Sequence, residues 1–151
     1  MTATATRFFN FPTLVQEAFT LGDCWHLAET IHTMTGHPII TASWTETVTE
    51  HDPITDEEEV WTYTSWSHVA VRLPDGRILD ILGIWSEQEW LDHWAEQSKV
   101  YFYDPEEQSI FIKEWAPAEW LVERQECSLT PSFSEAAHAP NYAKEMLSRI
   151  N

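Results

Sequence analysis

The sequence predicts an α+β domain in which N-terminal helices pack on a mostly antiparallel sheet. Three observations support this class: helical spacing of apolar residues early in the chain, strand-type composition in its middle, and a tight Pro74-Asp75-Gly76 turn between two apolar segments. Helices followed by a run of strands are typical of α+β proteins. The chain has 151 residues, the length of one ordinary domain, so we expect residues 1–151 to form a single domain.

Two helices are predicted near the N-terminus. Residues 11–20 carry apolar side chains at helical spacing. The second helix runs from Cys24 to about Thr35, with Asp23 at the N-cap position and Gly36 where a C′ residue belongs. These signals place Cys24 in the first turn of a helix.

The middle of the chain alternates strand and turn signals. Residues 38–44 and 60–66 have the composition of strands. The acidic stretch 46–59 between them predicts a loop. We expect its Glu-rich end, residues 57–59, to be a solvated loop or a lid over the site.

A hairpin is predicted around the Pro74-Asp75-Gly76 turn, with residues 67–73 and 77–83 as its strands. Pairing around this turn brings residue 80 opposite about residue 69. His68 and Asp80 are therefore expected to be neighbours at the open end of the hairpin. An Asp in that position can fix the tautomer of the imidazole and stabilise the imidazolium.

The C-terminal half predicts further helices and a second hairpin, without internal repeats. The expected elements are a helix over 86–97 with a Ser86/Glu89 capping box, a hairpin of residues 100–104 and 109–115, a short helix from about Pro117 with Trp120 and Leu121 facing inward, and a helix over 141–150.

Cys24 is the candidate nucleophile because of its position. A helix N-terminus supplies positive partial charge and N–H groups with no partner inside the helix, which favour a thiolate and can hold an oxyanion. The N–H of Cys24, together with that of Trp25, would bind the oxyanion formed at the attacked carbonyl. Trp25 and Trp66 stand close to the candidate nucleophile and base in the sequence, and we expect them to wall a substrate-binding cleft.

The residues around Cys24, His68 and Asp80 resemble a known catalytic pattern. GDCWHLAETIHTMTGHPI is similar to the Gly-x-Cys-x-x-x-Ala helix of papain-like and transglutaminase-like proteins, and SHVAVRLPDGRILDILG is similar to their His strand, turn and Asp strand. The resemblance covers residues 21–83 and extends to small bacterial and phage proteins of uncharacterised function. It implies a papain/transglutaminase-like fold, with Cys24 as nucleophile, His68 as base and Asp80 as the orienting acid.

The activity implied by the resemblance is that of a cysteine-dependent hydrolase or acyl transferase. A thiol protease, a deamidase and a transglutaminase-like enzyme all use these three residues on an amide, thioester or isopeptide carbonyl. The substrate would be a protein, a peptide or a small amide, and no cofactor or metal is expected. Papain-like enzymes often place a Gln before the Cys to complete the oxyanion hole, and Gln16 is the only candidate here.

Each of these residues also has a structural explanation of its own. A Cys on a helix can be a small buried hydrophobe, a His at the start of a strand can be structural, and Asp80 can cap a turn. The alternative function is a non-catalytic acidic binding or inhibitory protein, such as a phage-encoded one, or a pseudoenzyme on the same fold. His26, His32 and His37 lack the spacing of a zinc helix, and Cys127 is interpreted as a packing residue.

Composition limits the partners that the protein can have. Eight Lys and Arg stand against 25 Asp and Glu, a net charge of −17. Such a surface repels nucleic-acid phosphates and anionic membranes, so we expect neither as a partner, whereas a basic protein partner is compatible with it. No apolar run approaches the ~20 residues of a membrane span, and no secretory signal is recognisable. The chain also has only two cysteines, too few for a framework of disulfides, so we expect a cytoplasmic protein.

Overall fold

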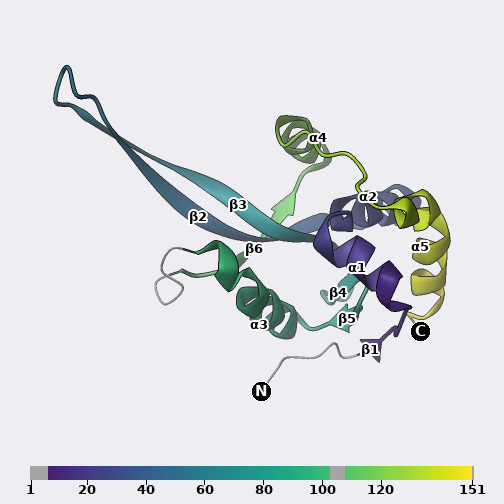
Figure 1. The fold of residues 1–151 in the computed structure, drawn as a ribbon. Coiled ribbons are helices and arrows are strands. Elements are labelled where there is room, and N and C mark those ends of the chain that lie inside the picture. Colours follow the sequence, from purple (N-terminus) through teal and green to yellow (C-terminus); the bar gives the residue numbers. More distant parts are fainter. Residues whose placement is uncertain (1–6, 103–107, 151) are drawn as a thin grey trace.

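The computed structural model of the protein describes residues 7–102 and 108–150, and these form an α+β fold built on one antiparallel sheet (Figure 1). The sheet has six strands in the order β1-β5-β4-β3-β2-β6, and every hydrogen-bonded pair is antiparallel. The predicted class, α+β with a mostly antiparallel sheet, is confirmed. The strands are β1 (Arg7–Phe8), β2 (Ile39–His51), β3 (Glu58–Arg72), β4 (Ile78–Asp80), β5 (Gly83–Trp85) and β6 (Phe111–Trp115).

The helices begin and end close to their predicted boundaries. Gly36 has the left-handed backbone (φ 77°) that ends the second helix, as expected of a C′ glycine. Ser86 and Glu89 form the predicted capping box of the third. None of the helices that the structure describes is both long enough and apolar enough to cross a bilayer. The helices are α1 (Thr13–Leu21), α2 (Cys24–Thr35), α3 (Glu87–Ser98), α4 (Pro117–Glu126), α5 (Ala139–Ser148) and the 3₁₀ helices Lys99–Tyr101 and Ser134–His138.

The helices cover both faces of the sheet. Val69 and Val71 of β3 pack with apolar residues of α1, α2 and α5. Ala70, between them, packs with Trp90 and Trp94 of α3. Because successive side chains of a strand point to opposite faces, α3 lies on the face opposite to α1, α2 and α5. The segment of β3 next to His68 is therefore enclosed from both sides.

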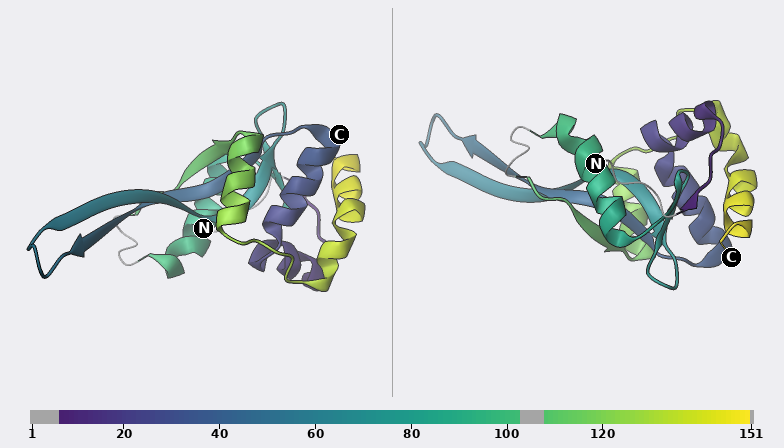
Figure 2. Two further views of the ribbon diagram at one scale, coloured as in Figure 1. Left: turned by 90° about the horizontal axis from the view of Figure 1, so that it is seen from above. Right: turned by 90° about the horizontal axis from the view of Figure 1, so that it is seen from below.

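β2 and β3 are longer than predicted and form a ribbon that projects from the body of the protein (Figure 1, Figure 2). They pair from Ile39↔Val71 to His51↔Glu58, so only residues 52–57 connect them. The prediction of a loop over 46–59 is therefore wrong for residues 46–51 and 58–59 and right for residues 52–57. Thr, Val and aromatic side chains alternate with the acids here, and such residues favour strands. The ribbon points away from the body, so the expected lid at 57–59 is wrong as well.

The C-terminal half differs from the prediction at two points. β6 pairs with β2, and Lys99–Tyr101 form a 3₁₀ helix where the first strand of the hairpin was expected. The remainder of that predicted strand and its turn fall on residues 103–107, outside the described residues. On α4, Trp120 is buried as expected, but Leu121 is 51 % exposed.

Candidate active site

Cys24 is the first residue of α2, and the turn before it is built around Asp23. The buried carboxylate of Asp23 accepts hydrogen bonds from the backbone N–H groups of Ser132 and Phe133, at 2.8 Å each, and makes no cap bond to α2. Asp23 thus stands at the predicted N-cap position, but its side chain anchors the segment that precedes α5. The N–H groups in the first turn of α2 are therefore not occupied by this carboxylate.

His68 lies on β3 beside an irregularity in the sheet. Ala42 pairs with His68, but the next residue of β2, Ser43, pairs with Trp66, so Ser67 is the extra residue of a β-bulge. Bulges re-aim neighbouring side chains and are frequent next to active sites. The His68 ring beside this bulge is fully buried.

Asp80, the last residue of β4, is buried and accepts five hydrogen bonds. Its Oδ1 accepts from two backbone N–H groups of the following turn (2.9 and 3.3 Å) and from the indole N–H of Trp85 (2.9 Å). Its Oδ2 accepts from the indole N–H of Trp90 (3.0 Å) and from Nε2 of His68 (3.3 Å). The carboxylate is thus held in place by donors on every side.

The contact predicted between His68 and Asp80 is confirmed, with one difference in register. Val71 pairs with Leu79, which places residue 80 opposite residue 70 rather than 69. His68 and residue 70 point to the same face of β3, so Asp80 meets the imidazole as a diagonal neighbour.

Cys24 and His68 are also brought together. Cys24 lies beside His68, and of the groups that raise the pKa of His68 it has the largest effect. Because Nε2 of the ring faces Asp80, Nδ1 is the nitrogen left for the thiol. Nδ1 is buried and makes no hydrogen bond of regular geometry to a described residue. Catalytic hydrogen bonds are often long in the free enzyme and tighten when substrate binds.

The electrostatics of this cluster favour a charged imidazole. Burial alone would lower the pKa of His68, but the Cys24 sulfur and the hydrogen bond to Asp80 outweigh burial and raise the pKa to about 9. Burial alone would raise the pKa of Asp80, yet the hydrogen bond and charge of His68, with the two indole N–H groups, hold it below its usual range. At neutral pH the pair is therefore an imidazolium and a carboxylate.

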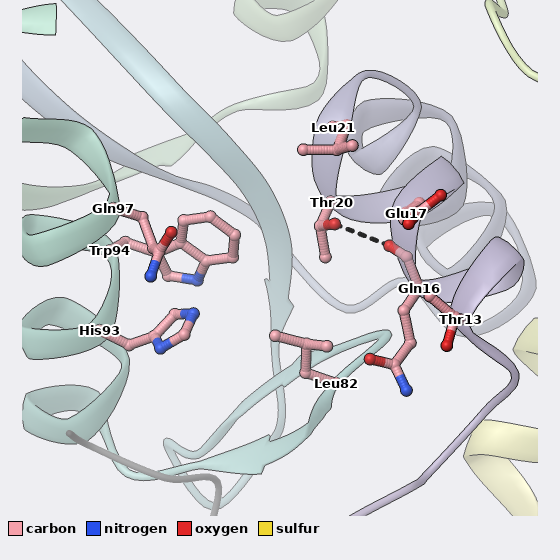
Figure 3. Close-up of a pocket in the computed structure, with 9 residues that line it drawn as sticks. All are labelled: Thr13, Gln16, Glu17, Thr20, Leu21, Leu82, His93, Trp94 and Gln97. Carbon is pink, nitrogen blue, oxygen red and sulfur yellow. Dashed lines mark hydrogen bonds between the residues drawn. The ribbon is translucent and has the colours of Figure 1, made fainter. Parts of the chain in front are cut away.

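Trp94 of α3 covers the cluster. Its indole stacks on the His68 ring, with the ring centroids 3.8 Å apart and the planes at 15°. Trp94 also forms part of the wall of a cavity of about 250 Å³ between α3 and α1, shown in Figure 3. Of the three side chains, His68 is fully buried, Asp80 is 3 % exposed and Cys24 is 6 % exposed.

The sequence does not reveal this role of Trp94. The spacing of Trp90 and Trp94 on α3 predicts packing on the core, and both are indeed buried. What the spacing cannot tell is that the core face beneath them carries His68 and Asp80.

Trp25 and Trp66 are placed against α4 rather than along this cavity. Trp25 is 1 % exposed and lies under the guanidinium of Arg124, which is 4.9 Å from the ring centroid. Trp66 packs on Trp120 and donates its indole N–H to Glu123 at 3.1 Å. Neither is among the residues that line the cavity between α1 and α3. Their contact with a substrate stays a prediction.

The second cysteine has a different environment. Cys127 follows α4, and its thiol donates a hydrogen bond to Glu123 at 3.3 Å. Burial, together with the carboxylates of Glu123 and Glu126, raises the pKa of Cys127 to about 11. In the part of the chain that the structure describes, no group of three or more His, Cys, Asp or Glu side chains is arranged to hold a metal ion.

Comparisons with known proteins give no match: no protein-family model, no curated protein and no solved structure resembles the chain significantly. What the protein does must therefore be inferred from the geometry of the three side chains and their surroundings.

Proposed function

We propose that the protein is a cysteine-dependent hydrolase or acyl transferase of the papain/transglutaminase-like type, acting on an amide, thioester or isopeptide carbonyl. One observation carries this proposal: the buried His68 ring has one nitrogen held by Asp80 and the other left for the thiol of Cys24. A purely structural histidine would be expected to have both ring nitrogens paired when buried.

Each side chain has a defined role in the proposed reaction. Cys24 attacks the carbonyl carbon as a thiolate, and the N–H groups of Cys24 and Trp25 at the start of α2 stabilise the oxyanion. His68, charged at neutral pH, protonates the leaving group. Asp80 keeps the ring oriented and stabilises its charge. Water or a second nucleophile then attacks the thioester, with His68 as the base.

Alkylation by iodoacetamide tests the proposed nucleophile without a known substrate. At pH 7 we expect Cys24 to be labelled at least about tenfold faster than Cys127, because thiolate is the reactive form and a pKa of about 11 leaves Cys127 almost wholly protonated. Replacing His68 with Gln, which can still donate to Asp80 but cannot carry the charge, should slow the labelling of Cys24 to near that of Cys127. Mass spectrometry of digests gives both rates.

The same experiment in denaturant is the control, since both thiols should then react at similar rates. Preferential labelling of Cys127 in the folded protein, or labelling of Cys24 that is unchanged by His68→Gln, would contradict the assignment of Cys24 as an activated nucleophile.

A second candidate, a binding protein that docks on a basic partner, is favoured by the β2–β3 ribbon. An isolated two-stranded ribbon is only marginally stable in water. This ribbon also exposes apolar side chains, such as Val60 (62 % exposed) and Trp61 (41 % exposed), which a partner could cover. Residues 45–64 contain no Lys or Arg. Their seven acidic residues are Glu46, Glu50, Asp52, Asp56, Glu57, Glu58 and Glu59.

Neutralising the tip of the ribbon separates the two candidates. The variant carries Asp52→Asn, Asp56→Asn, Glu57→Gln, Glu58→Gln and Glu59→Gln. We expect its acylation by p-nitrophenyl acetate to stay within about twofold of wild type, because exposed charges are screened beyond about 8 Å at physiological salt. Its affinity for poly-L-lysine should fall at least about tenfold, because five charges that repel one another and attract a polycation are gone.

A variant with five acids neutralised on the body of the protein is the matched control. If both variants lose the same affinity for poly-L-lysine, the ribbon has no special role in docking. If the ribbon variant loses acylation instead, the ribbon belongs to the catalytic function. The control positions are Asp92, Glu96, Glu114, Glu126 and Glu145, all exposed.

A further inference from the structure

One face of the β2–β3 ribbon carries acidic and apolar side chains in successive rows. Residues that pair directly across two antiparallel strands point to the same face, and the next row on that face lies two residues further along each strand. The rows of this face, which we call the ladder face, are from the tip inwards Glu50↔Glu59, Val48↔Trp61 and Glu46↔Tyr63. An acidic row, an apolar row and a row that joins an acid to an aromatic ring thus follow one another.

The ladder face is open to solvent. Trp61 and Tyr63, two large aromatic side chains in neighbouring rows, are both exposed, Tyr63 to 44 %. The ribbon that carries them projects from the body of the protein (Figure 1, Figure 2). Neighbouring exposed aromatic side chains are typical of surfaces that bind a partner.

The outer acidic row places two like charges side by side. Glu50 and Glu59 stand directly opposite each other, and both are exposed. Like charges in such a cross-strand pair repel each other and destabilise it. Residues 45–64 contain no Lys or Arg that could relieve this repulsion from within the ribbon. A cation supplied by a partner would relieve it.

The inner row holds one carboxylate in place next to an aromatic ring. Oε1 of Glu46 accepts a hydrogen bond from the indole N–H of Trp44 at 2.8 Å, and Oε2 accepts one from the hydroxyl of Tyr63. These hydrogen bonds hold the pKa of Glu46 below its usual range, so the carboxylate is charged at neutral pH. Each of its oxygens can accept a second hydrogen bond. A planar guanidinium can donate to this carboxylate and stack on the adjacent ring of Tyr63, so the row is better suited to arginine than to lysine.

The spacing of the rows defines the shape of the partner. Strands rise about 3.4 Å per residue, so the two rows that contain acids, which are four residues apart on each strand, are separated by about 14 Å. An extended peptide has the same rise, and its side chains at positions i, i+2 and i+4 point to one side. A peptide with basic, apolar and basic residues at these positions therefore meets the three rows in register.

We infer that the ladder face binds an extended segment of a partner protein that carries two arginines four residues apart, with an apolar residue midway between them. One arginine contacts Glu46 and Tyr63. The apolar residue packs on Trp61, and the second arginine lies between Glu50 and Glu59. This inference rests on the second candidate function, docking on a basic partner, and names the chemistry of that partner. It does not depend on the proposed cysteine chemistry.

Binding is tested by fluorescence anisotropy with the fluorescein-labelled peptide Thr-Arg-Thr-Val-Thr-Arg-Thr, which has arginine, valine and arginine on one side when extended. A second peptide has the same composition in the order Arg-Arg-Thr-Thr-Thr-Thr-Val, and a third has Lys in place of each Arg. Wild-type protein should bind the first peptide at least about fivefold more tightly than either of the others, because only the first places two guanidinium groups in register with the acids. Equal affinities for all of these peptides overturn the inference.

Matched variants on the two faces of the ribbon locate the binding. Glu46→Gln, on the ladder face, should lower the affinity for the first peptide about tenfold, because it removes the charged acceptor of one guanidinium. Glu58→Gln removes the same charge from the opposite face, where Glu58 pairs with His51, and should change the affinity by less than about twofold. Trp61→Ala should lower the affinity about fivefold without a change of charge, and Val60→Ala, on the opposite face, is its control.

The outcomes separate a failure of the inference from a failure of the function on which it rests. Equal losses in Glu46→Gln and Glu58→Gln would mean that only net charge matters; this result overturns the ladder face and leaves docking on a basic partner standing. If neither the first peptide nor poly-L-lysine binds the wild-type protein, the second candidate function is refuted together with the inference.

Discussion

Replacement of Cys24 by Ala is expected to abolish acylation by p-nitrophenyl acetate, lowering the rate by about 10³-fold or more. Wild-type protein should release a burst of p-nitrophenolate equal to the amount of enzyme, because the acetyl group stays on the thiol until water removes it. His68→Gln should lower the acylation rate nearly as much as Cys24→Ala does. The acylation rate of the double variant should be little lower than that of either single variant, because His68 acts on the substrate only through the thiol.

Cys127→Ala is the control for this experiment, since its thiol lies at the end of α4 and bonds to Glu123. It should leave both the burst and the steady rate unchanged. Circular dichroism of each variant checks that the fold is kept. If Cys24→Ala retains the burst, or if the losses in the two single variants multiply in the double variant, the three side chains do not act as a unit.

The parts of this site that could be predicted are those that depend on nearby residues in the chain. The end of α2 at Gly36 and the Ser86/Glu89 capping box follow from local backbone chemistry. α2 also begins at Cys24 as predicted, although Asp23 makes no cap bond to it. The contact of His68 with Asp80 follows from one tight turn, which fixes the pairing of the strands on either side to within one residue.

The parts that could not be predicted depend on contacts between distant segments. The carboxylate of Asp23 binds backbone N–H groups 109 and 110 residues further along the chain, and no local signal distinguishes that use from helix capping. β6 pairs with β2, although 68 to 76 residues separate the paired positions. The stack of Trp94 on His68 requires α3 to lie over one particular face of β3. The helix or strand propensity of a segment does not indicate which distant segment it will contact.

The β2–β3 ribbon shows a different kind of failure. Its acidic residues suggested a loop. Both faces of an exposed strand can be polar, however, so charged residues do not distinguish such a strand from a loop. The more informative pattern is the alternation of β-branched and aromatic residues over 60–64, which pairs with a segment of Thr and Val, as in Val48↔Trp61 and Thr47↔Thr62.

The largest effect on stability is expected from Asp80→Ala. This change leaves the N–H groups of Trp85 and Trp90 and the charged ring of His68 buried without their acceptor. Removing one partner of a buried ion pair destabilises a protein by about 3–5 kcal/mol, and we expect a loss of this size in the free energy of unfolding. Asp80→Asn keeps one oxygen acceptor and should lose less. Urea denaturation at pH 7, followed by tryptophan fluorescence, gives the three values.

The pH dependence of stability provides a second measure of the same pair. The pKa of His68 is raised, so its contribution is complete below about 6.5, its value in the unfolded chain, and is lost as the pH rises through about 9. The pKa of Asp80 is lowered, so its contribution is complete above about 3.8 and is lost as the pH falls through its folded value. Wild-type protein should therefore lose stability between pH 6.5 and 9, and His68→Gln, which carries no titrating ring, should lose much less over that range. If the free energy of unfolding changes equally with pH in the two proteins, the His68 ring is neutral in the folded state over this range. The proposal that an imidazolium at His68 protonates the leaving group would then be wrong.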